Sequence, residues 1–503
     1  MVQLRNPRYH RRGSGSIHRN ETETSPWKHA LTAKKFIPRV YQSAATDFIL
    51  QNDRCLLAVS MGMGKSVSTL NALDVLKLLG DDSKVLIVAP LRVARTTWAN
   101  ELQKWEHLCH YTLSPIVGTA KQRKEALYAQ ADFYTVNYEN LPWLVEELKG
   151  KWPFRIVVFD ESTKVKSHRS HFRSKADGSR YLVCTGGART NAIAKLMWTK
   201  VKRCILLTGT PAANGLKDLW GQNWFVDKGA ALGESYSAFE DRWYKIGYNG
   251  YDKVMLPFAE EEIRKSIAPT TFTLRAEDYL DLGKEILNTI IVDLPPKAQQ
   301  HYTEMEKELY TEVKNREIEA FTAAVKSQKC HQIANGAIYW DDKANYEEIH
   351  DAKIDALQSV IEEAAGMPVI VVYKFKSDLA RLQKAFPSGK AFDTKKKTED
   401  DFRAGLVPVL FLHPDSAGHG IDGFQTVTNI ICFFSVDWNG DTRSQVIARI
   451  GAVRQFQAGL DRPVFIHQIV CRNTVDEDIL RRIEEKLSVE EALKEGLARR
   501  GLK

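Results

Sequence analysis

The sequence predicts an α/β protein built as two parallel-sheet lobes in tandem with a helical insertion between them. In two stretches of the chain, short uninterrupted apolar runs alternate with helical patterns, and each run is bounded by Pro, Gly or polar residues. Strands of a parallel sheet have this pattern because helices cover both of its faces. The segment between the two stretches is aromatic and charged and carries a long helical pattern, which predicts the insertion.

Each expected element follows from its own pattern. The buried strands expected in the first lobe are Val85–Ala89, Phe133–Val136, Ile156–Phe159 and Ile205–Leu207. Those expected in the second lobe are Val369–Val372, Val409–Leu412, Ile430–Phe434 and Val464–Val470. Helical periodicity runs over 297–328 in the insertion, and a charged amphipathic helix is expected over 475–497. The 503 residues therefore divide into a basic tail (1–24), a first lobe (25–225), a helical inter-lobe region (226–345), a second lobe (346–475) and a C-terminal amphipathic helix (476–503).

Composition and charge are typical of a soluble globular protein. Hydrophobic residues make up 44% and charged residues 27% of the chain, and no apolar run approaches the roughly 20 residues that cross a bilayer. The Arg-rich segment Met1–Asn20 lacks the apolar core of a secretory signal, and we expect 1–24 to be disordered, either as an arm along phosphates or as a solvated tail. The seven cysteines form no CxxC pair and predict reduced thiols in a cytoplasmic compartment. A net charge of +8 suits a polyanionic partner but is also common among cytosolic proteins.

A glycine loop follows the apolar run Leu56–Val59 and precedes an apolar-periodic helix. It contains Gly62 and Gly64 and ends in Lys65 and Ser66. Backbone N–H groups of such a loop wrap phosphate oxygens, and the helix N-terminus adds positive potential. Lys65 would reach the β- and γ-phosphates, and Ser66 would ligate Mg²⁺. The strict P-loop pattern has Gly where this chain has Val59, so the loop alone is a weak signal.

Two adjacent carboxylates, Asp160 and Glu161, follow the strand Ile156–Phe159. At the C-terminal edge of a parallel sheet they would face the ligand crevice. Asp160 would hold Mg²⁺, and Glu161 would orient and deprotonate an attacking water. A solvated acidic pair is the alternative in isolation, but next to Lys65 the pair predicts nucleotide hydrolysis. The loop Leu207–Pro211 follows another strand and is either a sensor of nucleotide state or an ordinary turn.

The order of these motifs resembles that of superfamily 2 ATPases, and among them the Swi/Snf-type translocases. The resemblance covers residues 36–480. The matching segments are Ile37–Gln42, Met61–Ser66, Val88–Trp105, Asp160–Lys166, Leu207–Asn214 with Leu219 and Trp220, Arg275, Leu294–Lys297, His413–Asp422, Val436–Asn439 and Gln445–Gln455.

The resemblance implies two RecA-like lobes that close on ATP and Mg²⁺. It makes Gln42 the expected contact of the adenine base and places Gly420 and Asp422 among the nucleotide-binding residues. Arginine fingers from the second lobe would stabilise the charge that develops on the γ-phosphate. Such proteins track double-stranded DNA without separating its strands. The contacts to nucleic acid that the resemblance implies are Arg92, Tyr138, Thr210 and Trp438.

Three positions depart from the family's pattern. Thr163 stands where His is usual, and Ala417 where Gly is usual. Arg449 matches the first Arg of the sixth motif, whereas the place of the second is taken by Ala452, with Arg454 two residues further on. Either Arg454 has taken over the role of the second finger, which we favour, or hydrolysis is weakened and Arg454 is a surface charge.

A basic stretch that includes Arg169 and Arg173 lengthens the connection between the carboxylate pair and the next strand. Our hypothesis is a loop lying over the DNA backbone, since phosphate contacts give affinity without sequence preference. A mobile solvated loop is the alternative.

The sequence therefore predicts an ATP-dependent translocase on double-stranded DNA that remodels DNA or protein–DNA complexes in the cytoplasm of a bacterium or of a virus-infected host. The alternatives are a strand-separating DNA or RNA helicase, and a nucleotide-gated DNA-binding module that recruits a partner. A nuclease or a replication or recombination protein would be such a partner, and no association with a membrane is expected.

Overall fold

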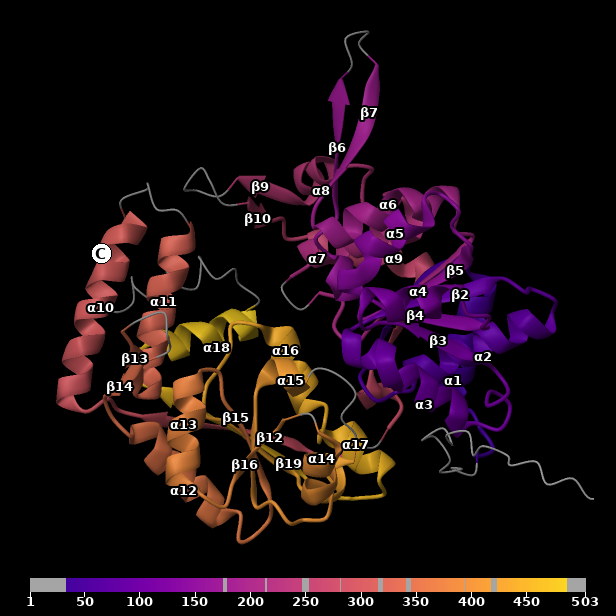
Figure 1. Ribbon diagram of the computed structural model, residues 1–503. Helices are drawn as coiled ribbons and strands as arrows, with labels where there is room; N and C mark the ends of the chain where they lie inside the picture. Colours follow the sequence, from indigo (N-terminus) through magenta and orange to yellow (C-terminus); the bar gives the residue numbers. More distant parts are fainter. Residues whose placement is uncertain are drawn as a thin grey trace, which may run out of the picture.

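The computed structural model describes residues 33–485 with the exception of 175–178, 213–214, 247–252, 281, 315–319, 341–344, 394 and 418–422. The described chain forms two α/β lobes, each built around one main sheet (Figure 1). The predicted α/β class with two parallel-sheet lobes is confirmed. Among the helices described, none combines the length and the apolar character needed to span a bilayer.

Lobe 1 contains a seven-stranded sheet of order β11-β1-β8-β5-β2-β4-β3, in which neighbouring strands are parallel. Its strands are β1 (Arg54–Val59), β2 (Lys84–Ala89), β3 (Leu113–Ile116), β4 (Phe133–Asn137), β5 (Phe154–Asp160), β8 (Arg203–Thr208) and β11 (Thr271–Leu274). Its helices are α1 (Val40–Gln51), α2 (Lys65–Leu78), α3 (Trp98–Lys104), α4 (Ala120–Tyr128), α5 (Leu141–Leu148), α6 (Ala188–Thr199), α7 (Lys217–Asp227), α8 (Tyr236–Trp243) and α9 (Ala259–Ile267).

Both faces of this sheet are covered, which explains the uninterrupted apolar runs of its strands. Along β5, Val157 and Phe159 enter one hydrophobic cluster, while Ile156 and Val158 enter the other. Successive side chains of a strand point to opposite faces, so a strand buried on both sides is apolar at its consecutive central positions.

Lobe 2 contains a six-stranded parallel sheet of order β12-β19-β18-β15-β17-β16. Its strands are β12 (Glu285–Val292), β15 (Val369–Val372), β16 (Lys390–Ala391), β17 (Val409–Leu412), β18 (Ile430–Phe433) and β19 (Val464–Cys471). Its helices are α12 (Ala352–Glu363), α13 (Lys376–Ala385), α14 (Lys396–Arg403), α15 (Pro414–Ala417), α16 (Gly440–Ile447), α17 (Ala452–Gln457) and α18 (Val475–Glu485). Every strand predicted for the two lobes is present.

The region 226–345 is not a single helical insertion, which corrects the predicted division of the chain. Phe239, Trp243 and Ile263 of α8 and α9 are buried in the core of lobe 1, and β11 belongs to the lobe 1 sheet. β12 already belongs to lobe 2, where it pairs with β19. Both strands lie at a sheet edge, and β12 is exposed along most of its length, so neither has the apolar run of a buried strand.

The helical pattern over 297–328 forms two helices instead of one. α10 (Pro296–Lys314) lies beside α11 (Ala320–Asn335), and α11 contacts α18 (Figure 1). A separate hydrophobic cluster holds them on lobe 2, and it includes Tyr302, Ile333, Val475 and Ile479. The inter-lobe helices are therefore part of the second lobe.

The basic stretch expected to be a loop is a β-hairpin. β6 (Arg169–Ser174) and β7 (Arg180–Thr185) pair in antiparallel fashion and project from lobe 1, as the top of Figure 1 shows. Two shorter hairpins are β9 (Tyr244–Ile246) with β10 (Lys253–Met255), and β13 (Ala337–Tyr339) with β14 (Tyr346–Glu348).

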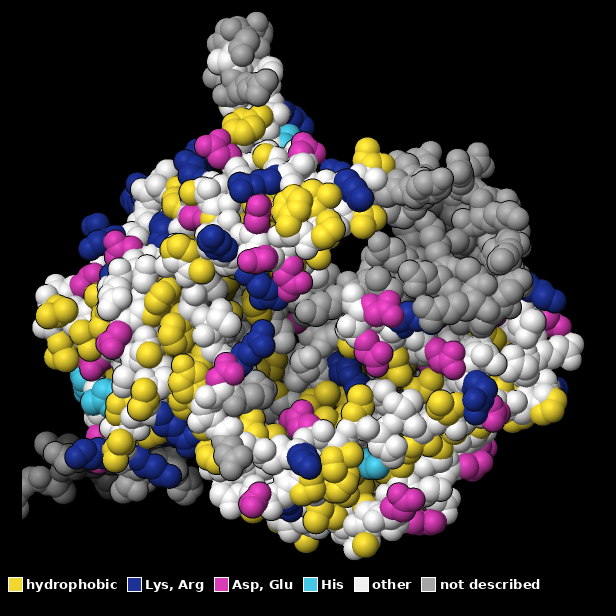
Figure 2. Space-filling view, turned by 180° about the vertical axis from the view of Figure 1, so that it is seen from behind, with side chains coloured by type: hydrophobic (Ala, Val, Ile, Leu, Met, Phe, Trp, Pro, Cys, Tyr) yellow, Lys and Arg dark blue, Asp and Glu magenta, His cyan; other side chains and the backbone are white. Residues whose placement is uncertain are grey.

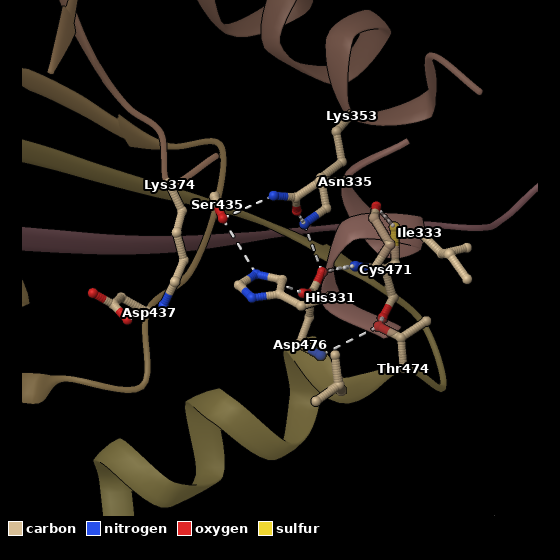
Figure 3. Close-up of polar contacts among 12 residues, drawn as sticks. His331, Ile333, Asn335, Lys353, Lys374, Ser435, Asp437, Cys471, Thr474 and Asp476 are labelled. Carbon is tan, nitrogen blue, oxygen red and sulfur yellow. Dashed lines mark hydrogen bonds and ion pairs between the residues drawn. The ribbon is translucent and has the colours of Figure 1, made fainter. Parts of the chain in front are cut away.

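Lobe 2 buries a charged network where β18 and β19 end (Figure 3). The ammonium group of Lys353 lies 2.6 Å from Asp476 Oδ2 and donates to Asn335 Oδ1 at 2.8 Å. The side chains of Lys353 and Asp476 have no exposed surface. His331 Nε2 lies 3.2 Å from Ser435 Oγ, and burial lowers the pKa of His331 well below its usual range, so the imidazole is neutral. The network joins α11, α12 and α18 to the sheet.

Candidate active site

The glycine loop lies between β1 and α2, as predicted. Gly62 and Gly64 have φ angles of +82° and +85°, in the left-handed region where a side chain is strained. A Cβ at Gly64 would also overlap the side-chain amide of Gln42. No side chain caps the N-terminus of α2. The loop and the start of the helix thus present backbone N–H groups to an anion.

Charged groups from both lobes surround Lys65. Its ammonium group donates to the carbonyl oxygens of Val59 at 2.8 Å and of Ser60 at 3.3 Å. Burial lowers the pKa of Lys65, the carboxylates of Glu161 and Asp160 raise it, and the guanidinium groups of Arg454 and Arg449 lower it further. The structure therefore brings together the lysine, the two carboxylates and the two arginines selected from the sequence.

Asp160 and Glu161 stand at the C-terminal end of β5, where two buried aromatic residues hold them. The indole N–H of Trp98 donates to Asp160 Oδ2 at 2.9 Å. The hydroxyl of Tyr138 donates to the backbone carbonyl oxygens of Asp160 at 2.8 Å and of Glu161 at 3.2 Å. Burial raises the pKa of both carboxyl groups, and the charge of Asp160 raises that of Glu161 further.

Helix α17 of lobe 2 lies directly against the glycine loop. Gln457 Nε2 donates to the carbonyl oxygen of Gly62 at 2.6 Å. A Cβ built on Gly62 would lie 3.0 Å from Val453 Cγ1 and 3.7 Å from Arg454 Nε. Ala452 is turned the other way: it is buried, and its N–H donates to Glu285 Oε1 at 2.9 Å. Position 454, and not position 452, therefore faces the loop.

Further polar contacts join the lobes. The hydroxyl of Thr210 donates to Asp441 Oδ1 at 2.7 Å. Lys166 lies 2.9 Å from Asp218 of its own lobe and 3.9 Å from Asp441 of the other. Lys166 and Asp441 line a polar cavity of about 500 Å³ between the lobes. Its lining includes Thr163, Lys164, Lys166, Trp438, Asn439, Asp441 and Arg482.

The residues expected to contact nucleic acid are not gathered on one surface. Trp438 lines the cavity, and Thr210 is bonded to Asp441 at its edge. Arg92 is paired with Glu399 of lobe 2, so it links the lobes. Tyr138 is only 1% exposed and holds the end of β5, which leaves no ring surface for an external ligand.

The two hairpin arginines differ from each other. The guanidinium of Arg169 donates to the carbonyl oxygens of Lys166 and His168, both at 2.7 Å, and lies over the ring of Tyr236, so it braces the base of the hairpin. Arg173 is exposed near the tip. Gly420 and Asp422 lie outside the described residues.

Trp98, Asp441 and Gln457 belong to the site although the sequence did not single them out. The sequence pattern of a tryptophan on an apolar helix face does not distinguish a core residue from one that contacts a carboxylate of the site. Asp441 and Gln457 act across the cleft, so their role depends on how the lobes pack, which no local pattern encodes.

Comparison with known proteins places this geometry in a family. A family model described as the SNF2-related domain matches residues 30–341. Protein p41 of Acyrthosiphon pisum secondary endosymbiont phage 1 is 46% identical over 473 residues, which cover 93% of this chain and 100% of that protein. The ATP-dependent DNA helicase DDM1 of Arabidopsis thaliana is 20% identical over 86% of this chain, but the match spans 58% of the plant protein.

The ATP-dependent helicase YqhH of Bacillus subtilis is 22% identical, over 91% of this chain and 79% of that protein. Among solved structures, the Sulfolobus solfataricus SWI2/SNF2 ATPase core in complex with dsDNA is 20% identical, covers 93% of this chain and 96% of its own, and has a TM-score of 0.41. Because the family model matches more than half of its length, the chain belongs to the SNF2-related family and is an ATP-dependent, helicase-like ATPase.

Proposed function

We propose that the protein is an ATP-driven motor that translocates on double-stranded DNA and thereby remodels DNA or protein–DNA complexes. The observation that carries this proposal is the contact of α17 with the glycine loop. It sets Arg454 opposite Lys65, Asp160 and Glu161 across the cleft between the lobes. Opening and closing of the lobes would then make and break the catalytic arrangement, as a motor requires.

The residues present fit a nucleoside triphosphate with Mg²⁺. The glycine loop and the start of α2 offer backbone donors to the phosphates, Lys65 offers a cation, and Ser66 and Asp160 are oxygen ligands of the kind that Mg²⁺ prefers. When bound, the metal neutralises charge on the phosphates. Gln42 lies against the loop, which supports its assignment as the contact of the base.

Glu161 is the residue that we assign as general base. Its raised pKa makes the carboxylate a stronger base than an ordinary glutamate, which favours acceptance of a proton from water. We assign Arg449 and Arg454 as the arginine fingers. In support of Arg454, the backbone of Ala452 is fixed on Glu285, so a side chain at 452 points away from the loop that Arg454 faces.

The DNA partner is supported by the relatives and by the β6–β7 hairpin. In an antiparallel pair, directly opposed residues share a face, and alternate residues along a strand do so too. The register opposes Arg169 to Thr185, His171 to Val183 and Arg173 to Tyr181. One face of the hairpin is therefore basic along β6, and Tyr181 beside it is 42% exposed. Figure 2 shows Lys or Arg and His side chains at the base of this projection. A two-stranded ribbon also has the width of a DNA major groove.

The central experiment compares ATP hydrolysis with duplex DNA, single-stranded DNA and RNA at matched salt. Stimulation by duplex DNA without strand displacement is expected. Stimulation by RNA or single strands together with displacement would instead identify a strand-separating helicase. Slow hydrolysis that no nucleic acid changes would identify a nucleotide-gated module, which acts by recruiting a nuclease or a replication or recombination protein.

A second experiment tests the hairpin. Arg173→Ala should reduce the slope of log affinity for duplex DNA against log salt by about 1, because one phosphate contact is lost. Lys121→Ala is the control, since Lys121 is equally charged and 87% exposed on α4 of the same lobe. Equal slopes for both variants and the wild type would rule out a DNA contact at Arg173.

The similarity to a phage protein further supports action in the cytoplasm of a bacterial host.

A further inference from the structure

Trp98 has no role in the proposed mechanism, but it donates a hydrogen bond to Asp160. The indole Nε1 of Trp98 lies 2.9 Å from Asp160 Oδ2, and the tryptophan side chain has no exposed surface. Indole nitrogen is only a donor, so the bond fixes which carboxylate oxygen faces the tryptophan. The bond engages one of the two carboxylate oxygens of Asp160.

The local backbone explains how a core tryptophan reaches the end of β5. Residues Val93–Thr97 form a π-helical turn directly before α3, which begins at Trp98. A π-turn adds a residue to a helical turn and rotates everything that follows, and such turns occur frequently at functional sites. The hydroxyl of Thr135 on β4 donates to the carbonyl oxygen of Ala94 at 2.5 Å and holds the turn on the sheet.

We propose that Trp98 is a positioning residue that orients Asp160 for Mg²⁺, which goes beyond the assignment of Asp160 as a ligand and rests on the proposed function. Partners that hydrogen-bond to a ligating carboxylate set its orientation, and removing one typically costs about 10–100-fold in metal affinity or activity. The tryptophan touches neither nucleotide nor metal in this scheme; it acts through the carboxylate.

The chain provides a matched control for the loss of this bond. Trp105, at the other end of α3, donates from its own Nε1 to Glu101 Oε1 at 2.8 Å. The two bonds therefore share donor type, acceptor type and length. Glu101 is one turn away in the same helix and not in the site. Trp98→Phe and Trp105→Phe each remove one indole N–H and keep an aromatic ring.

The experiment measures binding of a fluorescent ATP analogue, first in EDTA and then across a Mg²⁺ titration. For Trp98→Phe, the affinity for the ATP analogue in EDTA should equal that of the wild type. The Mg²⁺ concentration that gives half of the Mg²⁺-dependent change in binding should rise about 10–100-fold. ATP hydrolysis should recover at high Mg²⁺. Trp105→Phe should match the wild type throughout.

Three results would overturn the inference. An unchanged Mg²⁺ requirement in Trp98→Phe would show that the bond does not orient a ligand. A loss of affinity for the ATP analogue that is already present in EDTA would show that Trp98 has only a structural role in the core. Nucleotide binding by the wild type that ignores Mg²⁺ would overturn the metal site and this inference together, whereas a failure of DNA to stimulate hydrolysis would overturn only the proposed DNA motor. If Trp98→Phe does not fold, the indole N–H resonance of wild-type Trp98 decides: it should shift when Mg²⁺ joins the nucleotide complex, and that of Trp105 should not.

Discussion

The buried ion pair of Lys353 and Asp476 makes lobe 2 sensitive to the loss of one charge. Both side chains are without exposed surface and their charged atoms are 2.6 Å apart. In Asp476→Asn, the amide can still accept the backbone N–H of Cys471, which donates to Asp476 Oδ2 at 3.0 Å in the native protein. The ammonium group of Lys353 then has only neutral acceptors, the new amide oxygen and Asn335 Oδ1, and no counter-ion in contact.

The expected cost follows from the burial. Removing one partner of a buried pair destabilises a protein by about 3–5 kcal/mol, because the remaining charge has lost both water and its counter-ion. For a lobe of about 200 residues, this corresponds to a fall in Tm of about 6–20 °C. Removing both charges, in Lys353→Met with Asp476→Leu, should restore most of the stability. About 1–3 kcal/mol should remain lost, because the Cys471 N–H then has no acceptor.

Urea denaturation, with hydrogen exchange followed in α12 and α18, measures these costs. Glu348→Gln is the control, since it breaks a pair with Lys384 of 3.2 Å in which the side chains are 40% and 73% exposed. Such a surface pair contributes about 0–1 kcal/mol. If Asp476→Asn loses no more stability than Glu348→Gln, the reasoning from burial is refuted.

Two further predictions concern the site and the acid response of lobe 2. If Arg454 is an arginine finger, Arg454→Ala should lower DNA-stimulated ATP hydrolysis by about 10³–10⁵-fold. The control, Arg472→Ala, breaks a surface ion pair with Asp293 and should leave the rate unchanged. Equal rates for the two variants would show that Arg454 is a surface charge. Burial raises the pKa of Asp378 from 3.8 to about 6, so the folded state holds this proton more tightly than the unfolded state. Its contribution to stability is therefore complete below pH 3.8 and is lost as the pH rises through 6, a change of about 3 kcal/mol. Asp378→Asn should remove that part of the pH dependence in urea titrations between pH 4 and 7, and an unchanged dependence would contradict the assignment.

The strands could be predicted from the sequence wherever both faces of the sheet are covered. β5 and β15 are apolar at nearly every position, because each faces a hydrophobic cluster on both sides. β12 could not be found in this way, since an edge strand is stabilised by backbone pairing with β19 and its side chains face solvent. The division of the chain at 225 was wrong for the same reason: β11 is a short edge strand.

The gathering of the charged groups at one place was predictable, and their contacts were less so. Lys65, Asp160 and Glu161 follow strands at one sheet edge, so their meeting could be inferred from topology. The position of Arg454 against Gly62 depends on how lobe 2 packs on lobe 1, and only the family resemblance pointed to it. Tyr138 and Arg92 show the limit of that resemblance. The motif position was matched, but burial of the first and the ion pair of the second give each a different task in this chain.

Polar side chains make much of the contact between the lobes, as in Thr210 with Asp441 and Gln457 with Gly62. A hydrogen bond of this kind contributes about 0.5–1.5 kcal/mol. Each of these bonds is a small term in the free energy of lobe closure. In the proposed motor, a ligand shifts the balance between closed and open arrangements by its differential affinity for the two. Coupling of this kind is reciprocal, so if ATP favours closure, a load that opposes closure weakens ATP binding. In the proposed motor, a load on the DNA would therefore promote release of ATP before hydrolysis.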